Sequence, residues 1–124
     1  MNVVLWVVAG LLAAAFLAAG LTKVTSPREK LLERMAWVND FPQGQVKAIG
    51  ALEVLGAIGL VLPALTKIAP VLVPLAATGL VLTMAGAVVV HLRRGDGFGA
   101  AVPSLVLGLL SLFVAWGRFG AYAF

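Results

Sequence analysis

Residues 46–62 read VKAIGALEVLGAIGLVL, an apolar run with one acidic residue, Glu53, inside it. The run approaches the ~20 residues that a helix needs to cross a bilayer. A carboxylate in hydrocarbon is costly, so it needs a partner, and it often marks a functional site. The run therefore predicts a membrane span with a polar centre.

The rest of the chain has the composition of a membrane protein. Of 124 residues, 62% are hydrophobic and 11% are charged, and the mean hydropathy is +1.09. A soluble domain carries about 25% charged residues. The basic residues gather between apolar runs, which indicates contact with lipid head groups rather than with nucleic acid. The chain has no cysteine, which excludes thiol relays and iron–sulfur clusters.

Four spans are predicted, at about 3–21, 46–62, 72–90 and 101–117. The first has no basic residue before its apolar core, so it reads as a span rather than a cleaved signal. The second and fourth are short, which predicts local thinning of the bilayer or an extra turn. Four spans are too few for a closed barrel, so they must be helices. We predict an all-α, polytopic membrane protein, a four-transmembrane-helix bundle that forms one domain over residues 1–124.

The connections are short except for the first, whose sequence pattern is typical of a soluble protein. Ser26-Pro27-Arg28-Glu29 has the form of a capping box with proline at the first helical position. Apolar residues behind it share one face, and this predicts a short amphipathic surface helix at about 27–38. The second connection is expected to begin at Pro63 and to include Pro70, and the third is a turn over 93–97.

The positive charges indicate how the chain is oriented. The loops after the first and third spans carry Lys23, Arg28, Lys30, Arg34, Lys47, Arg93 and Arg94, whereas the opposite side carries Lys67 and Arg118. The positive-inside rule predicts that both termini lie outside the cell membrane and that residues 22–45 and 91–100 are cytoplasmic.

Three predicted helices bring polar side chains to one leaflet. Glu53 shares its angular sector with Gly50 and Ala57, and small residues line helix contacts in lipid, so Glu53 should face the bundle interior. Lys23 ends the first span on the same side and His91 ends the third, which permits a buried Glu–Lys or Glu–His pair. With Met84 at the depth of Glu53, the candidate ligand-binding cluster is Lys23, Glu53, Met84 and His91.

Each of these residues also has a purely structural interpretation. A buried ion pair can simply fix helix register, or Glu53 can be protonated and bonded to a backbone carbonyl. His91 can be an interfacial residue and Met84 a packing residue. Ser104, Ser111 and Arg118 repeat every seven residues as a second polar stripe, either for helix–helix hydrogen bonds or as a polar path across the bundle. No metal site is predicted, because one histidine and one buried carboxylate are too few ligands.

Several short stretches resemble the DoxX-like family of small four-helix membrane proteins. They are Ala19-Gly20-Leu21-Thr22-Lys23, Lys47-Ala48-Ile49-Gly50-Ala51-Leu52-Glu53, Gly59-Leu60-Val61-Leu62-Pro63, Pro74-Leu75-Ala76-Ala77, and Met84-Ala85-Gly86-Ala87 with His91. The resemblance covers nearly the whole chain. The family takes its name from a subunit of a thiosulfate:quinone oxidoreductase, so the resemblance implies an accessory subunit that binds a partner oxidoreductase or a quinone.

Three functions follow as hypotheses. The first is this accessory subunit, with a partner redox protein and quinone as its only suggested cofactor. The second is a binder of, or an enzyme acting on, a small apolar or lipid-like molecule, with buried Glu53 as acid, base or anchor. The third is proton- or ion-coupled transport, which would require oligomerisation, because four helices make a small pathway and only one acidic residue is buried. The glycine-rich helix faces permit a homodimer. The bilayer itself is the one partner common to all three.

Overall fold

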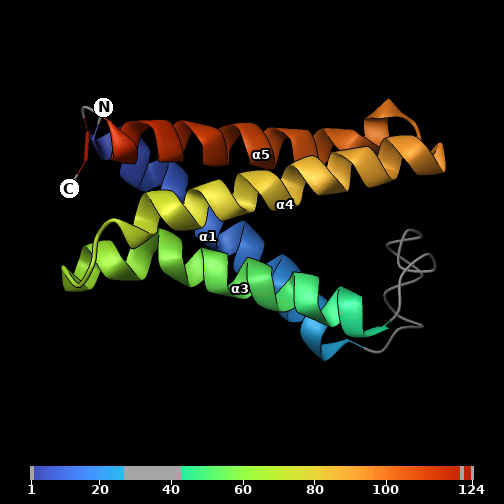
Figure 1. Cartoon of the computed structure of the whole chain (residues 1–124), viewed down its shortest axis with the longest axis horizontal. Coiled ribbons are helices and arrows are strands. Elements are labelled where there is room, and N and C mark those ends of the chain that lie inside the picture. The colour runs from blue at the N-terminus through green and yellow to red at the C-terminus, as the bar shows by residue number, and fades with distance from the viewer. Residues whose placement is uncertain (1, 27–42, 121, 124) are drawn as a thin grey trace.

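The computed structural model describes residues 2–26, 43–120 and 122–123. Within them lie four helices: α1 (Asn2–Thr25), α3 (Gln43–Thr66), α4 (Leu72–Arg94) and α5 (Phe98–Phe119) (Figure 1). All four are long and apolar enough to cross a membrane. The predicted all-α architecture with four membrane-spanning helices is confirmed. The predicted amphipathic helix at 27–38 lies outside the described residues.

The helices extend beyond the predicted spans. For the second and fourth the sequence predicted local thinning of the bilayer or an extra turn, and the helices do extend by extra turns, because α3 has 24 residues and α5 has 22. Pro63, expected in the loop, is buried inside α3. Proline lacks the N–H that would bond the carbonyl four residues earlier, but one lost bond near the end does not stop the helix. It continues for three residues to Thr66.

The bundle consists of two helix pairs. α1 packs most extensively on α3, and α4 on α5, whereas α3 with α4 and α1 with α5 make smaller contacts. Figure 1 shows the two pairs close together near the N-terminus and diverging toward the end where α4 turns into α5. This divergence separates the ends of the helices that carry the predicted polar cluster.

Glycines allow α1 and α3 to cross at very short range. A Cβ placed on Gly20 would lie 2.6 Å from the carbonyl oxygen of Gly50, and one on Gly50 would lie 2.7 Å from the Cβ of Lys23. Real side chains do not fit at such distances, so the crossing requires glycine at both positions. It lies directly beside Lys23.

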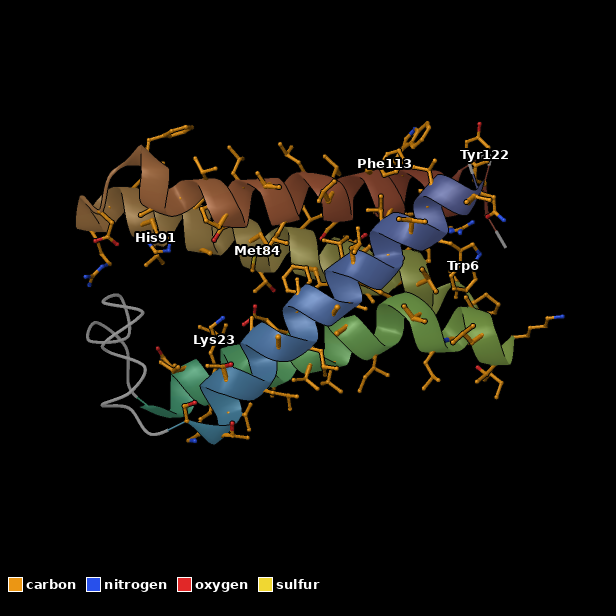
Figure 2. All side chains as sticks on the ribbon, turned by 180° about the vertical axis from the view of Figure 1, so that it is seen from behind. Trp6, Lys23, Met84, His91, Phe113 and Tyr122 are labelled. Atoms are coloured by element: carbon orange, nitrogen blue, oxygen red, sulfur yellow. The ribbon has the colours of Figure 1, made fainter. Side chains whose placement is uncertain are left out.

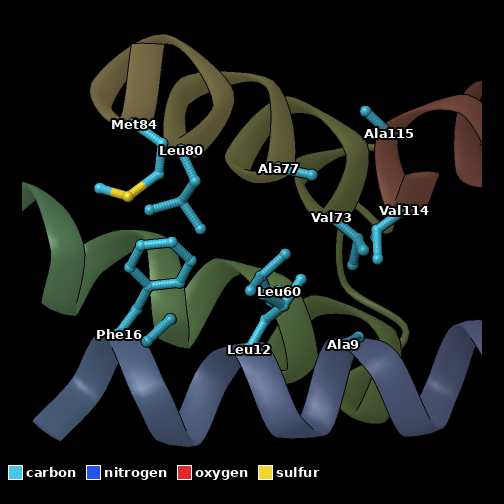
Figure 3. Close-up of a cluster of buried hydrophobic side chains, with 11 residues drawn as sticks. Ala9, Leu12, Phe16, Leu60, Val73, Ala77, Leu80, Met84, Val114 and Ala115 are labelled. Atoms are coloured by element: carbon cyan, nitrogen blue, oxygen red, sulfur yellow. The ribbon is translucent and has the colours of Figure 1, made fainter. Parts of the chain in front are cut away.

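The apolar core joins all four helices at the end where the pairs meet. Figure 3 shows its members, from Ala9, Leu12 and Phe16 on α1 to Val114 and Ala115 on α5. Met84 is the member of the core nearest to Gly95 along α4. Leucine and valine side chains on the outer faces are widely exposed, for example Leu11 at 67% and Leu55 at 64%. Such faces suit a lipid environment, where apolar exposure costs nothing.

Candidate ligand cavity

A buried ion pair joins α1 to α3. The Lys23 Nζ donates to Glu53 Oε1, and only 8% of Lys23 and 2% of Glu53 are exposed. Glu53 lies ten residues into α3, roughly 15 Å along the helix axis at ~1.5 Å per residue. Of the two partners that the sequence allowed, Lys23 is therefore the one that contacts Glu53.

The backbone beside the pair is held from both helices. The Gly20–Gly50 crossing brings α1 and α3 together one turn from Lys23. Lys47 Nζ donates to the carbonyl oxygen of Val24 at 2.7 Å, which satisfies one of the last carbonyls of α1. A cation here also complements the negative end of the helix dipole. The ion pair thus lies on a rigid crossing.

The same pair forms part of the wall of a partly open cavity of about 430 Å³ between the two helix pairs. The cavity brings together four helices and five of the predicted polar-site residues: Lys23, Glu53, Met84, His91 and Ser104. Apolar side chains such as Ile49, Leu82 and Leu107 make up much of the remaining wall. Figure 2 shows Lys23 and His91 on the two diverging helix pairs, with Met84 further along α4 toward the core.

His91 has a different carboxylate partner from the one considered in the sequence. Its Nδ1 lies 3.0 Å from Asp96 Oδ2, and Arg94 Nε donates to the same oxygen at 3.1 Å. The hydrogen bond from His91 is the main reason that the pKa of the Asp96 carboxyl lies below its ordinary value of 3.8. Desolvation is the next largest effect and raises this pKa, and the hydrogen bond and charge of Arg94 lower it again. Asp96 is therefore ionised across the neutral range.

The turn after α4 explains how Asp96 reaches His91. Gly95 takes a left-handed conformation with φ 74°, and its N–H bonds back to the carbonyls of His91 and Leu92. The N–H of Asp96 donates to the His91 carbonyl at 3.1 Å. This is a Schellman motif, which favours glycine at this position because other residues are strained there. Both the backbone and the side chain of Asp96 thus contact His91.

The other two residues of the second polar stripe lie away from the cavity. Ser111 is buried and donates to the Leu107 carbonyl of its own helix at 2.8 Å. Arg118 is 4% exposed, and its Nη1 donates to Asn2 Oδ1 and to the Tyr122 carbonyl, with the Trp6 ring 5.8 Å away. Ser104, Ser111 and Arg118 therefore serve three separate environments rather than one shared site.

Sequence reasoning missed two contributors to this region. Asp96 was treated only as part of a turn, although a glycine after two basic residues is a recognisable helix end that could have indicated it. Thr83 also forms part of the cavity wall, and its hydroxyl donates to the Gly79 carbonyl at 2.9 Å. No group of three or more His, Cys, Asp or Glu gathers as a metal site among the described residues.

Comparison with known proteins agrees with the resemblance of the short motifs. The model of the DoxX-like family matches residues 7–114, which include α3 and α4, most of α1 and α5, and every residue that lines the cavity. No curated protein and no solved structure is similar enough to match.

Proposed function

We propose, from the premise that this chain belongs to the DoxX-like family of membrane proteins, that it binds a small, largely apolar molecule inside the bilayer. A quinone or a lipid-like compound fits this description. The observation that carries the proposal is the buried Lys23–Glu53 pair on the wall of a cavity of about 430 Å³. That volume lies within the ~300–1,000 Å³ of typical ligand pockets, which are mostly apolar with a few polar groups.

The chemistry of the pair suits a polar anchor. A carboxylate has several acceptor positions, so Glu53 can accept a hydrogen bond from a donor group of a ligand as well as from Lys23. The charges largely neutralise each other, so the pair can be buried without a ligand. In this surrounding a hydrogen bond to a carbonyl or hydroxyl group of the ligand is strengthened by the low dielectric. The apolar wall then takes the ring or tail.

The accessory-subunit hypothesis has less support from the described residues. The amphipathic segment predicted at 27–38, which would offer a partner a docking surface, lies outside them. A quinone remains one member of the ligand class, because it is largely apolar and its ring carbonyls can accept hydrogen bonds. Ligand binding through Glu53 as an anchor is therefore the function that the cavity favours.

The arrangement of cations supports the orientation predicted from the sequence. Lys23, Lys47, Arg93 and Arg94 lie at the end of the bundle that holds the cavity, and Lys67 and Arg118 at the other. Under the positive-inside rule the cavity end faces the cytoplasm. Cysteines introduced at Gly97 and Ala69 would test this in a chain without native cysteine. Labelling of Ala69→Cys, and not Gly97→Cys, from outside intact cells is expected, and the reverse pattern would contradict it.

The binding experiment uses a variant that fills the cavity. Gly86 lies on the cavity wall, and a Cβ placed there meets nothing within 4 Å, so a larger side chain can enter the space. Gly79 lies two turns earlier on the same helix face, also with open space around it, but outside the cavity wall. It provides a matched control on α4.

Binding of decylubiquinone to purified protein in nanodiscs would be measured by calorimetry. Wild type and Gly79→Phe should bind equally, and Gly86→Phe should bind about tenfold or more weakly, since it removes part of the apolar contact. The double variant Lys23→Met/Glu53→Leu should keep the fold and also bind weakly. No binding by wild type, or equal loss in both glycine variants, would reject the cavity as the site.

A further inference from the structure

We infer that the ligand carries a hydroxyl group, as a phenol, a hydroquinone or an enol does, and that His91 accepts a hydrogen bond from it. This rests on the proposed function and deepens it by naming the ligand's chemistry. The two polar clusters of the cavity are chemically different. Lys23 and Glu53 lie on the wall made by α1 and α3, whereas His91 lies on the wall made by α4 (Figure 2).

The protonation of His91 follows from its contact with Asp96. The Asp96 carboxylate is ionised at neutral pH, and its Oδ2 already accepts from Arg94 Nε. An ionised carboxylate can only accept hydrogen bonds, so His91 Nδ1 must carry the proton in their 3.0 Å contact. In the neutral imidazole the other ring nitrogen, Nε2, is then an acceptor.

The turn keeps the ring in this state. The Schellman motif at Gly95 places Asp96 beside His91 through backbone hydrogen bonds, and Arg94 holds the carboxylate from the other side. A carboxylate that fixes the tautomer and orientation of a histidine is a common device where the opposite nitrogen has a chemical role. Asp96 is thus a positioning residue, and the described structure places it outside the cavity wall.

An acceptor on the wall of an apolar cavity selects for a donor. A lone pair removed from water without a partner costs free energy, so a ligand that brings an O–H is favoured over one that does not. A quinone carbonyl only accepts hydrogen bonds, so it would leave His91 Nε2 without a donor. A hydroxyl can donate to His91 Nε2, so this wall fits the reduced, hydroxyl-bearing form of such a ligand better than a ketone.

The test compares para-octylphenol with para-octylanisole, which have the same ring and tail but differ in the hydroxyl proton. Affinities would be measured by calorimetry in nanodiscs at neutral pH. Wild type should prefer the phenol by about tenfold, which corresponds to one net hydrogen bond. Thr83→Val is the matched control on the same wall, because the Thr83 hydroxyl is already bonded within its own helix. It should keep the same preference for the phenol.

Two variants separate recognition from structure. His91→Phe should bind the two compounds with equal affinity, because no acceptor remains for the phenol hydroxyl. Asp96→Asn keeps the imidazole but releases its tautomer, so its preference for the phenol should be smaller. A wild type that binds decylubiquinone and both octyl compounds equally would overturn this inference alone. A wild type that binds none of them would overturn the proposed function as well.

Discussion

Lys23 and Arg118 are both buried cations in membrane-spanning helices, but they lie at opposite ends of the bundle and in opposite surroundings. Lys23 contacts a carboxylate beside a cavity of about 430 Å³. Arg118 Nη1 contacts an amide oxygen of Asn2 and a backbone carbonyl of Tyr122, in a region where Gly117 packs directly against Leu5. Lys23 therefore lies next to a cavity, whereas Arg118 lies in a tightly packed region.

This difference separates two uses of a buried charge. At the Arg118 end the guanidinium ties the start of α1 to the end of α5, and the contact accounts for its presence. At the Lys23 end the ion pair also joins two helices, α1 and α3, but those helices are already held by the Gly20–Gly50 crossing. A structural role alone does not explain why the opposite helix pair diverges there and leaves room. The ligand binding proposed above would account for this space.

The largest effect should come from removing the carboxylate at the cavity end. Glu53→Leu leaves the Lys23 ammonium buried without its partner and should lower the free energy of unfolding by about 3 kcal/mol. Adding Lys23→Met should recover most of this loss, because the buried charge is then gone. The quantity is measured by reversible unfolding in mixed micelles.

The matched change at the other end is Asn2→Ala, which removes a neutral acceptor from Arg118. It should cost about 1 kcal/mol, since Asn2 is exposed and water can replace its oxygen. Equal losses at the two ends would remove the contrast between them.

A double variant at Lys23 and Glu53 no more stable than Glu53→Leu would show that packing, and not charge, holds the pair.

The glycine contacts should give the next effect in size. A Cβ on Gly20 meets the Gly50 backbone at 2.6 Å, whereas one on Gly117 meets the end of the Leu5 side chain at 2.7 Å. A side chain can change rotamer and a backbone crossing cannot, so Gly20→Ala should cost about 2 kcal/mol and Gly117→Ala about 1 kcal/mol or less. Thermal unfolding of the two variants side by side measures this, and the opposite ranking would show that the α1–α3 crossing yields more easily than the Leu5 contact.

The sequence predicted the four helices because long apolar runs have few other solutions in a bilayer. It underestimated their length, because hydropathy falls at the first polar residues while the helical backbone continues. Thr22 and Thr25 show why: their hydroxyls donate to the carbonyls of Ala18 and Leu21, four residues earlier, and so remain compatible with the helix. Pro63 was wrongly predicted to lie in a loop for a related reason: a helix tolerates one missing N–H near its end.

The site could be predicted only in part. Glu53, Lys23 and His91 could be assigned to one leaflet from their positions, but the choice of Lys23 as partner depends on how closely α1 and α3 cross. The cavity depends on the divergence of the two helix pairs, which no local pattern encodes. Asp96 reaches His91 through one left-handed residue, Gly95. The roles of these residues in binding remain predictions for the experiments above.

The smallest effect concerns acid. The pKa of Asp96 is lowered in the folded protein, so its contacts with His91 and Arg94 stabilise the fold above the ordinary value of 3.8. That stabilisation is lost as the pH falls below 3.8 and through the lower folded value, because the unfolded chain takes up the proton first. The difference in unfolding midpoint between wild type and Asp96→Asn should therefore be small near neutrality and shrink in this acidic range.

Arg118 Nη1 contacts an amide and a carbonyl oxygen, which do not titrate, so Asn2→Ala should differ from wild type by a constant amount over the same range. A gap for Asp96→Asn that widens in acid would mean that the carboxylate opposes folding and does not hold His91 in place.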